Sequence, residues 1–316
     1  MLKTQITDLL SIRYPIFQGG MAWIADGTLA AAVSEGGGLG IISAMNADGD
    51  YLRGQIALAR RLTDRPFGVN IMLMSPHADE VARIAAEEGV AVVTTGAGSP
   101  VKYMPAWKSA GIRVIPVVAS VSMAVMCERA GADAVIAEGQ ESGGHIGEAT
   151  TMALVPQVVD AVHIPVLAAG GIADGRGLAA ALMLGAQGVQ MGTRFLAAAE
   201  CGVHENYKQM VLGASDTSTI VTGRRFGGSA CRQIKNNFSR SFAKFEYSAD
   251  ATAEAVAERG VGALRRAALD GDTKEGCFLA GQIAGLVTRE QPAAEILSEV
   301  TEEAQTILKG ASQWLV

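Results

Sequence analysis

The chain of 316 residues carries 32 acidic and 26 basic side chains, which gives a formal net charge of −6. Hydrophobic residues make up 49% and charged residues 18% of the sequence, a profile typical of a globular protein with a large core. The acidic balance argues against a general nucleic-acid binder, whose surface is usually basic. No apolar run approaches the ~20 residues needed to cross a bilayer, so we expect no membrane span.

The residues Met1 to Gln5 are not followed by the long apolar stretch of a signal peptide. The chain has four cysteines, no two of them close in sequence, which favours reduced thiols over disulfides or a zinc site. They are Cys127, Cys201, Cys231 and Cys277. We therefore expect a cytoplasmic protein without a metal centre.

Short apolar runs recur along the first two thirds of the chain, and we expect each to form a strand. Segments with helical periodicity separate them, so that strands and helices alternate. The predicted strands are Pro15–Gly20, Leu39–Met45, Phe67–Leu73, Ala91–Gly98, Arg113–Ala119, Ala134–Gly139, Ile164–Gly171 and Gly188–Phe195.

Several helix signals lie between these runs. Asp26 precedes an alanine-rich helix, Ser75-Pro76 opens a helix over 78–88, and Asp174 opens one over 177–184. Four glycines follow helical runs where a left-handed cap is expected, namely Gly89, Gly111, Gly131 and Gly185.

Eight strands alternating with eight helices predict an α/β fold of the closed (β/α)8 type, the TIM barrel, which typically takes ~250 residues. The alternative is an open doubly wound sheet, which has fewer strands and a glycine fingerprint after the first one. Here the glycines of 36–40 precede the second strand instead, where they end a helix and turn the chain. The barrel is therefore the favoured fold.

The strand–helix period stops near residue 200. Residues 217–244 mix glycine, arginine and asparagine with little apolar patterning, whereas 251–269 and 293–308 have helical periodicity. We expect residues 1–214 to form the barrel and 215–275 a small cap over its mouth. Residues 276–316 would be helices that pack back on the barrel.

Two glycine motifs point to a bound phosphate. In barrels, the loops after strands seven and eight often form a phosphate site. Gly170, Gly171 and Gly192 would let backbone N–H groups approach the phosphate, with a hydroxyl from Thr193 and a helix N-terminus nearby. A tight turn is the alternative for the glycine pair alone. The two motifs together predict a phosphorylated ligand and leave open whether it is substrate or cofactor.

The segment from Ala137 to Gly147 holds two acids, four glycines and one histidine. Of the four histidines, only His145 lies in a glycine loop at the end of a predicted strand, where it could transfer a proton near neutral pH. A solvent-exposed loop histidine is the alternative. Glu138 is a candidate for binding a cofactor, whereas we expect Glu141 to be solvated.

Two further segments could face a planar ring. Gly20, Met21 and Ala22 give an open backbone beside a soft apolar side chain, although a simple glycine turn explains them equally well. Asn70 is the one amide in an apolar strand, and a buried amide needs polar partners such as the edge of a heterocycle. A core asparagine bonded within the protein is the alternative there.

Together these residues resemble the FMN-dependent enoyl-acyl-carrier-protein reductases called FabK, and their close relatives the nitronate monooxygenases. The residues from Gln18 to Met21 are more similar to the reductases, whereas Arg224-Arg225 differ from the smaller or neutral residues expected there. The matching segments are Tyr14–Trp23, Pro66–Leu73, Val92–Gly98, Glu138–Gly147, Ala168–Asp174, Gly192–Phe195 and Ala280–Val287.

The resemblance implies FMN at the barrel mouth, NADH or NADPH as co-substrate, and a monovalent cation as a further candidate. It implies reduction of trans-2-enoyl thioesters on acyl carrier protein, by a homodimer with His145 as the catalytic residue. Oxidation of alkyl nitronates with O2 is the alternative. The flavin contacts it implies are Gly20, Met21, Ala22, Asn70, Glu138, Gly144, Gly170, Gly171, Gly192 and Thr193.

Two more distant alternatives share parts of this pattern. A barrel like IMP dehydrogenase needs a nucleophilic cysteine after the sixth strand, and residues 139–147 contain none. A flavin-binding sensor without catalysis would have no use for the histidine loop.

Residues 215–245 form a basic island of net charge +5, because six cations stand against Asp216 alone. Acyl carrier proteins are acidic, and opposite charge speeds encounter. The island could therefore be a docking face for the carrier, with a solvated surface as the alternative. Its cations are Arg224, Arg225, Arg232, Lys235, Arg240 and Lys244.

Overall fold

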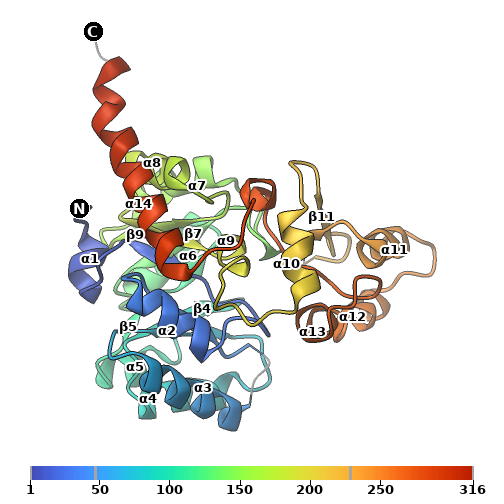
Figure 1. The fold of residues 1–316 in the computed structure, drawn as a ribbon. Coiled ribbons are helices and arrows are strands. Elements are labelled where there is room, and N and C mark those ends of the chain that lie inside the picture. Colours follow the sequence, from blue (N-terminus) through green and yellow to red (C-terminus); the bar gives the residue numbers. More distant parts are fainter. Residues whose placement is uncertain (1, 46–47, 228–229, 315–316) are drawn as a thin grey trace.

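The protein is described here from a computed structural model that covers residues 2–45, 48–227 and 230–314. Parallel strands surrounded by helices form its larger part (Figure 1), which confirms the predicted (β/α)8 barrel. All eight predicted runs contain a strand, and the fifth is divided in two at residues 115–116. The barrel strands are β1 (Ile16–Gln18), β2 (Ile41–Ser43), β3 (Gly68–Met72), β4 (Val92–Gly96), β5 (Arg113–Val114), β6 (Val117–Val118), β7 (Val135–Glu138), β9 (Val166–Ala169) and β10 (Gly188–Met191).

Backbone hydrogen bonds close this barrel. One parallel run has the order β2-β3-β4-β5 and the other β1-β10-β9-β7-β6. At the first seam, the N–H of Gln18 donates to Leu39 O and the N–H of Leu39 donates to Ile16 O, both at 3.0 Å. At the second seam the chain itself continues from β5 to β6. The strand ends therefore form a ring, and side chains at these ends share one mouth.

Helices cover the outside of the barrel. The Asp26 side chain caps the helix that follows it at 2.9 Å from Leu29 N, as predicted. The glycines predicted to end helices all have positive φ, from 59° at Gly89 to 97° at Gly131. The helix predicted over 78–88 ends one residue earlier. The helices are α2 (Gly27–Glu35), α3 (Gly49–Leu62), α4 (Ala78–Glu87), α5 (Met104–Ser109), α6 (Val121–Arg129), α7 (Thr151–Ala161) and α8 (Gly175–Met183).

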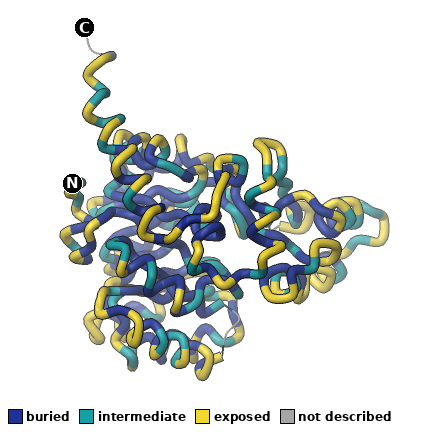
Figure 2. Tube along the Cα trace, viewed as in Figure 1, coloured by how far each residue is buried: buried dark blue, intermediate teal, exposed yellow. Residues whose placement is uncertain are grey.

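The barrel interior is closed at its amino end. The helix α1 (Gln5–Leu10) places Ile6 and Leu10 in one cluster with inward side chains of the strands, such as Phe17 and Leu167. Figure 2 shows buried residues running through the centre of the barrel and exposed residues on its outer turns. Among the described residues, the open end of the barrel is therefore the one at the carboxyl ends of the strands.

The remaining residues add a second group of elements beside the barrel mouth (Figure 1). The strands β11 (Thr219–Thr222) and β12 (Cys231–Ile234) form a hairpin, and β12 also pairs with β8 (Gly144–His145). A separate small core around Phe238 and Phe242 holds the helices between residues 237 and 265, whereas the helices between 193 and 212 pack on the main core. These elements are α9 (Thr193–Leu196), α10 (Glu205–Leu212), α11 (Asn237–Glu246), α12 (Ala253–Gly260), α13 (Ala263–Arg265), a π-helical turn at Arg266–Asp270 and a 3-10 helix at Gln282–Leu286.

The last long helix, α14 (Ala293–Gly310), packs against α8 and α2 and leads into a 3-10 turn at Ala311–Trp314. Glycines make this packing close, since a Cβ at Gly175 would lie 2.4 Å from Ala304 N. In the described part of the chain, no helix is long and apolar enough to span a membrane. The same residues contain no group of three or more His, Cys, Asp or Glu side chains that could hold a metal ion.

The sequence did not predict β8, β11 or β12. These strands are two to four residues long and pair antiparallel with partners up to 88 residues away, as for Arg232 and Gly144. Short strands of this kind are formed by their tertiary partners and have no period of their own. The histidine loop is thus one edge of a small sheet, which holds its backbone in place.

Candidate active site

A cavity of about 710 Å³ lies at the carboxyl ends of the barrel strands. Residues at or just after the ends of β1, β3, β4, β7, β9 and β10 line it, as expected for a barrel active site. Every residue that the sequence analysis singled out as catalytic or cofactor-binding lies in this lining. They are Gly20, Met21, Ala22, Asn70, Glu138, Gly144, His145, Gly170, Gly171, Gly192 and Thr193.

Glycine opens the wall of the cavity after β9 and β10. Gly170 and Gly171 have φ of 87° and 73°, a left-handed backbone that a side chain at these positions would strain. At Gly192 a Cβ would meet only Met21, at 3.7 Å, so the space beside this residue belongs to the cavity. The Thr193 hydroxyl accepts from Gly281 N at 2.9 Å and keeps its own proton to donate.

The sequence predicts a helix N-terminus beside the phosphate, but neither helix that follows these motifs offers a free one of useful length. The Asp174 carboxylate occupies the N-terminus of α8, where it accepts from the N–H groups of Arg176 and Gly177. The helix after β10, α9, has only four residues and a correspondingly small dipole. Any phosphate site here therefore depends on glycine N–H groups and the Thr193 hydroxyl.

The opposite wall is built on a close contact between β1 and β3. A Cβ at Gly20 would lie 2.3 Å from the Asn70 Cβ, so only glycine allows this approach. The amide oxygen of the buried Asn70 accepts from the Thr94 hydroxyl at 3.0 Å. No described residue accepts a hydrogen bond from its amide nitrogen, which leaves two N–H donors at the cavity wall.

Methionines line much of the cavity, a feature that the sequence analysis missed except at Met21. Several of them lie at or just beyond the ends of barrel strands, a position that could have signalled them. The thioether side chain is flexible and polarisable, and it adapts to irregular apolar ligands. The cavity thus combines polar glycine turns with a soft apolar wall. The methionines are Met21, Met45, Met72, Met74, Met123 and Met191.

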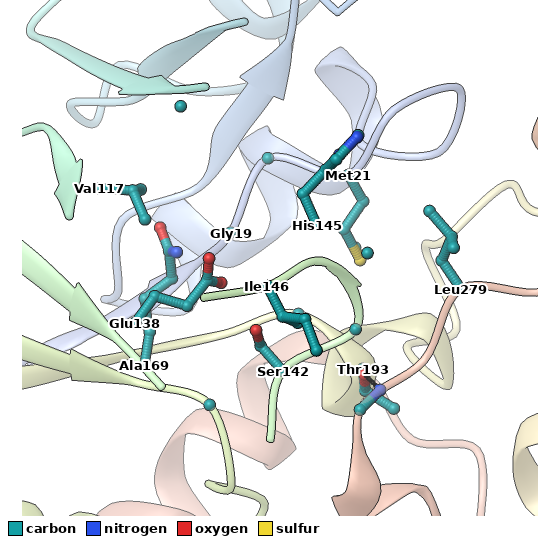
Figure 3. A pocket seen from close by; sticks show the side chains of 18 of the residues that line it. Gly19, Met21, Val117, Glu138, Ser142, His145, Ile146, Ala169, Thr193 and Leu279 are labelled. Carbon is teal, nitrogen blue, oxygen red and sulfur yellow. Dashed lines mark hydrogen bonds between the residues drawn. The ribbon is translucent and has the colours of Figure 1, made fainter. Parts of the chain in front are cut away.

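Glu138 ends β7 with its side chain at the cavity. Figure 3 shows Glu138 and Ala169 on one side of this space and Thr193 and Leu279 on the other. Burial raises the pKa of the Glu138 carboxyl to about 7, and a hydrogen bond from Ser142 only partly offsets that effect. Near neutral pH the carboxyl group therefore exists in both forms. The protonated form can donate a hydrogen bond, and the ionised form can only accept one.

This raised pKa predicts a change in the pH dependence of stability. The pKa is about 7 in the folded protein and near 4.5 when unfolded. The contribution of this group to the free energy of unfolding is therefore fully present below pH 4.5, and it is lost as pH rises through 7. We expect Glu138→Gln to gain about 1–3 kcal/mol of unfolding free energy relative to wild type between pH 5 and 8. Urea unfolding at several pH values measures this; parallel curves for the two proteins would contradict it.

His145 projects from β8 at the cavity mouth. The residue is exposed to solvent at the cavity mouth. Enough protein surrounds the imidazole, however, that partial desolvation lowers its pKa. The imidazole is therefore mainly neutral at pH 7. A neutral imidazole can donate one hydrogen bond and accept another, which suits a proton relay.

Glu141 is not solvated, contrary to expectation. Its carboxylate accepts from Thr151 N at 3.0 Å and from the Thr151 hydroxyl at 2.9 Å, at the N-terminus of α7. The backbone oxygen of Glu141 also accepts from Gln282 N at 2.9 Å. Glu141 therefore fixes the loop between β7 and β8 to two other elements and is a structural residue.

Arg232 supports the histidine loop from behind, in contrast to the surface position that the sequence predicted. It was counted among the cations of the basic island, but its side chain is buried. Its guanidinium donates to Gln140 O at 3.0 and 3.2 Å and to the Thr219 hydroxyl at 3.2 Å, and its backbone pairs with Gly144. No local sequence signal marks this role, because Gln140 lies 92 residues away.

We expect Arg232→Met to loosen the histidine loop. The change keeps the apolar stem and leaves the Gln140 carbonyl without its donors, which typically costs about 1–3 kcal/mol. Amide hydrogen exchange at Gly144 and His145 should become faster, alongside the lower unfolding free energy. Arg224→Met, at an exposed position of the same hairpin, is the control and should change neither. Unaltered exchange at His145 in Arg232→Met would show that the loop is held by other contacts.

A closed barrel whose strand ends surround a large cavity has the architecture of a (β/α)8-barrel enzyme. The chain belongs to the nitronate monooxygenase family, whose model matches residues 3–303. This confirms the superfamily that the sequence motifs indicated.

Individual relatives extend over nearly the whole chain. FabK from Thermotoga maritima is 50% identical, with a TM-score of 0.97 and full coverage of both chains. A Mycobacterium tuberculosis enzyme named (3aS,4S,5R,7aS)-5-hydroxy-7a-methyl-1-oxo-octahydro-1H-indene-4-carboxyl-CoA dehydrogenase is 33% identical over 98% of each chain. A probable nitronate monooxygenase of Staphylococcus aureus is 34% identical and covers 97% of this chain and 99% of its own.

Proposed function

We propose that this protein is an FMN-dependent enoyl-acyl-carrier-protein reductase that uses NADH or NADPH. The observation that carries the proposal is its full-length similarity to FabK, at 50% identity, together with a histidine at the mouth of the barrel cavity. The Mycobacterium tuberculosis relative is named for a CoA thioester, so two different relatives support thioester chemistry on this fold. A cytoplasmic homodimer, in which 215–275 caps the barrel of 1–214 and 276–316 packs on its wall, is part of the proposal.

The cavity fits FMN by the chemistry of its walls. Gly170, Gly171, Gly192 and Thr193 would hold the phosphate, since no side chain fills the space at Gly192 and the Thr193 hydroxyl is free to donate. Asn70 would bind the ring edge with its unpartnered amide N–H groups. When bound, FMN supplies hydride transfer from a nicotinamide nucleotide to the β-carbon of the enoyl thioester.

The protein's own residues handle charge and protons. Negative charge develops on the thioester oxygen during reduction, and the N–H of neutral His145 would donate a hydrogen bond to that oxygen. The proton for the α-carbon would come from solvent through the same imidazole, one ring nitrogen taking up a proton as the other releases one. Glu138, with its pKa of about 7, would donate to or accept from the polar edge of the bound ring. The apolar methionine wall would exclude water from the reacting carbons.

A direct assay tests this proposal. FMN-loaded protein under anaerobic conditions, given crotonyl-CoA and either NADH or NADPH, is expected to oxidise the nucleotide and form butyryl-CoA. No oxidation beyond the rate without the thioester would refute the reductase function. Gel filtration with light scattering measures the expected dimer.

Nitronate oxidation is the second candidate function, favoured by the family model and by the Staphylococcus aureus relative. Neutral His145 could serve there as the base for the α-proton of a nitroalkane. The same preparation with alkyl nitronate in air would consume O2. Oxygen uptake without crotonyl-CoA reduction would assign the protein to this activity instead.

A further inference from the structure

The surface of α11 and the adjoining hairpin carries an unusual concentration of positive charge. Arg232 is buried, but the other five cations of residues 215–245 are exposed, with Asp216 as the only acid in the same segment. We name these five residues the basic face. The next acid in the sequence, Glu246, is buried at the end of α11 and accepts from Gly223 N and Arg225 N. Exposed acids begin at Asp250. The basic face consists of Arg224, Arg225, Lys235, Arg240 and Lys244.

These cations have no carboxylate partners. Among the residues that the structure describes, none of the five forms an ion pair within 4.0 Å. On the barrel the pattern differs: Asp133, for example, pairs with both Lys108 and Arg113, at 2.7 and 3.0 Å. Within the described residues, no ion pair neutralises the charge of the basic face, which is therefore available to an acidic partner.

Two of the cations even repel each other. Arg240 and Lys244 lie at positions i and i+4 of α11, both exposed, where like charges destabilise a helix. Arg225 is fixed in place, because its guanidinium donates to Glu246 O and Ser248 O, both at 2.9 Å. That bond ties the turn of the hairpin to the end of α11, so the two parts form one surface.

The basic face is directly linked to the candidate active site. Cys231 of β12 pairs with His145, and Ile146 N donates to Ala230 O at 3.0 Å. Lys235 lies four residues farther along the same strand direction, about 13 Å from Cys231 at 3.3 Å per residue. A thioester arm of about a dozen bonds spans roughly 15 Å when extended. A carrier bound at this face could therefore reach the cavity with its arm.

We propose that the basic face docks the acidic carrier protein that delivers the enoyl thioester. The inference rests on the proposed function, because only a carrier-linked substrate requires such a surface. Complementary charge would raise the association rate and orient the carrier, with a strong dependence on ionic strength. Figure 1 shows α11 in the lobe beyond α10, separate from the barrel helices, where a partner would not collide with α2 to α5.

Charge reversal at three positions tests the docking surface. Arg224→Glu, Arg240→Glu and Lys244→Glu are combined because these side chains are exposed and unpaired. We expect kcat/KM for crotonyl-acyl-carrier-protein to fall at least tenfold at low salt, with that for crotonyl-CoA within twofold of wild type. The Kd of the unacylated carrier, measured by calorimetry, should rise by a similar factor. KM for NADPH should not change.

The control is an equal charge reversal elsewhere, Arg61→Glu, Arg65→Glu and Arg129→Glu, at exposed positions of the barrel. It should leave both substrates and carrier binding nearly unaffected. Equal losses on the two thioesters, or carrier binding that matches wild type, would overturn the docking surface. If wild type reduces neither thioester, the proposed function fails, and the calorimetric titration still decides whether the basic face binds the carrier.

Discussion

Replacing His145 with alanine should lower kcat for crotonyl-CoA reduction by about 100- to 10,000-fold, the usual contribution of a positioned acid or base. The physical reason is that the thioester oxygen loses its donor and the α-carbon its proton relay. FMN should stay bound, because the proposed phosphate contacts and the Asn70 ring contact lie on other elements, and the contact proposed at Gly144 does not use the His145 side chain. Anaerobic stopped-flow turnover, with the flavin absorbance of the purified protein, measures both effects.

A second variant distinguishes two roles of this histidine. His145→Gln keeps an N–H donor but has no titratable nitrogen, so it should recover part of the reductase activity if hydrogen bonding is the main contribution. His163→Ala, at an exposed position before β9, is the matched control and should behave like wild type. Full activity in His145→Ala would remove the residue from the mechanism.

Replacing Gly192 with valine should weaken FMN binding at least tenfold, which corresponds to about 1.4 kcal/mol. Gly192 has φ of −104°, so valine fits the backbone, and its Cβ would meet only Met21 at 3.7 Å. The added side chain would extend from this open position into the space proposed for the phosphate. Fluorescence titration of the apoprotein with FMN measures the change.

The control for this substitution adds the same side chain away from the cavity. Gly54→Val lies on the exposed side of α3, where a Cβ meets no atom within 4 Å. It should leave FMN affinity unchanged. Undiminished affinity in Gly192→Val would mean that the phosphate lies elsewhere in the cavity, and the glycine pair at 170–171 would be the next candidate.

Strand and helix periodicity predicted most of the barrel, because parallel strands buried on both faces need continuous apolar runs. Asp26 and Asp174 predicted helix starts through a local capping bond, and such bonds depend on neighbours only three residues apart. The glycine motifs predicted residues that do line one cavity. Strand ends of a barrel always meet at one mouth, so a motif at a strand end is placed by the fold.

The sequence could not predict the contacts between distant segments. The sequence predicts Arg232 as a surface cation, but the pairing of β12 with β8 buries it, and its guanidinium donates to Gln140 O. Glu141 counted as solvated until the N-terminus of α7 supplied donors to its carboxylate. In both cases the hydrogen-bond partner that fixes the side chain belongs to another element of the fold. Sequence periodicity does not indicate which distant segments meet.

The sequence by itself determined the eightfold alternation of strands and helices, the glycine turns and the position of His145 in a glycine loop after a strand, because each follows from local backbone preference and burial. Only the tertiary structure decided that the pKa of His145 is lowered, that the pKa of Glu138 is raised, and that the histidine loop is held by a distant hairpin. Those properties depend on how much protein surrounds each group, and burial is set by segments that meet only after folding.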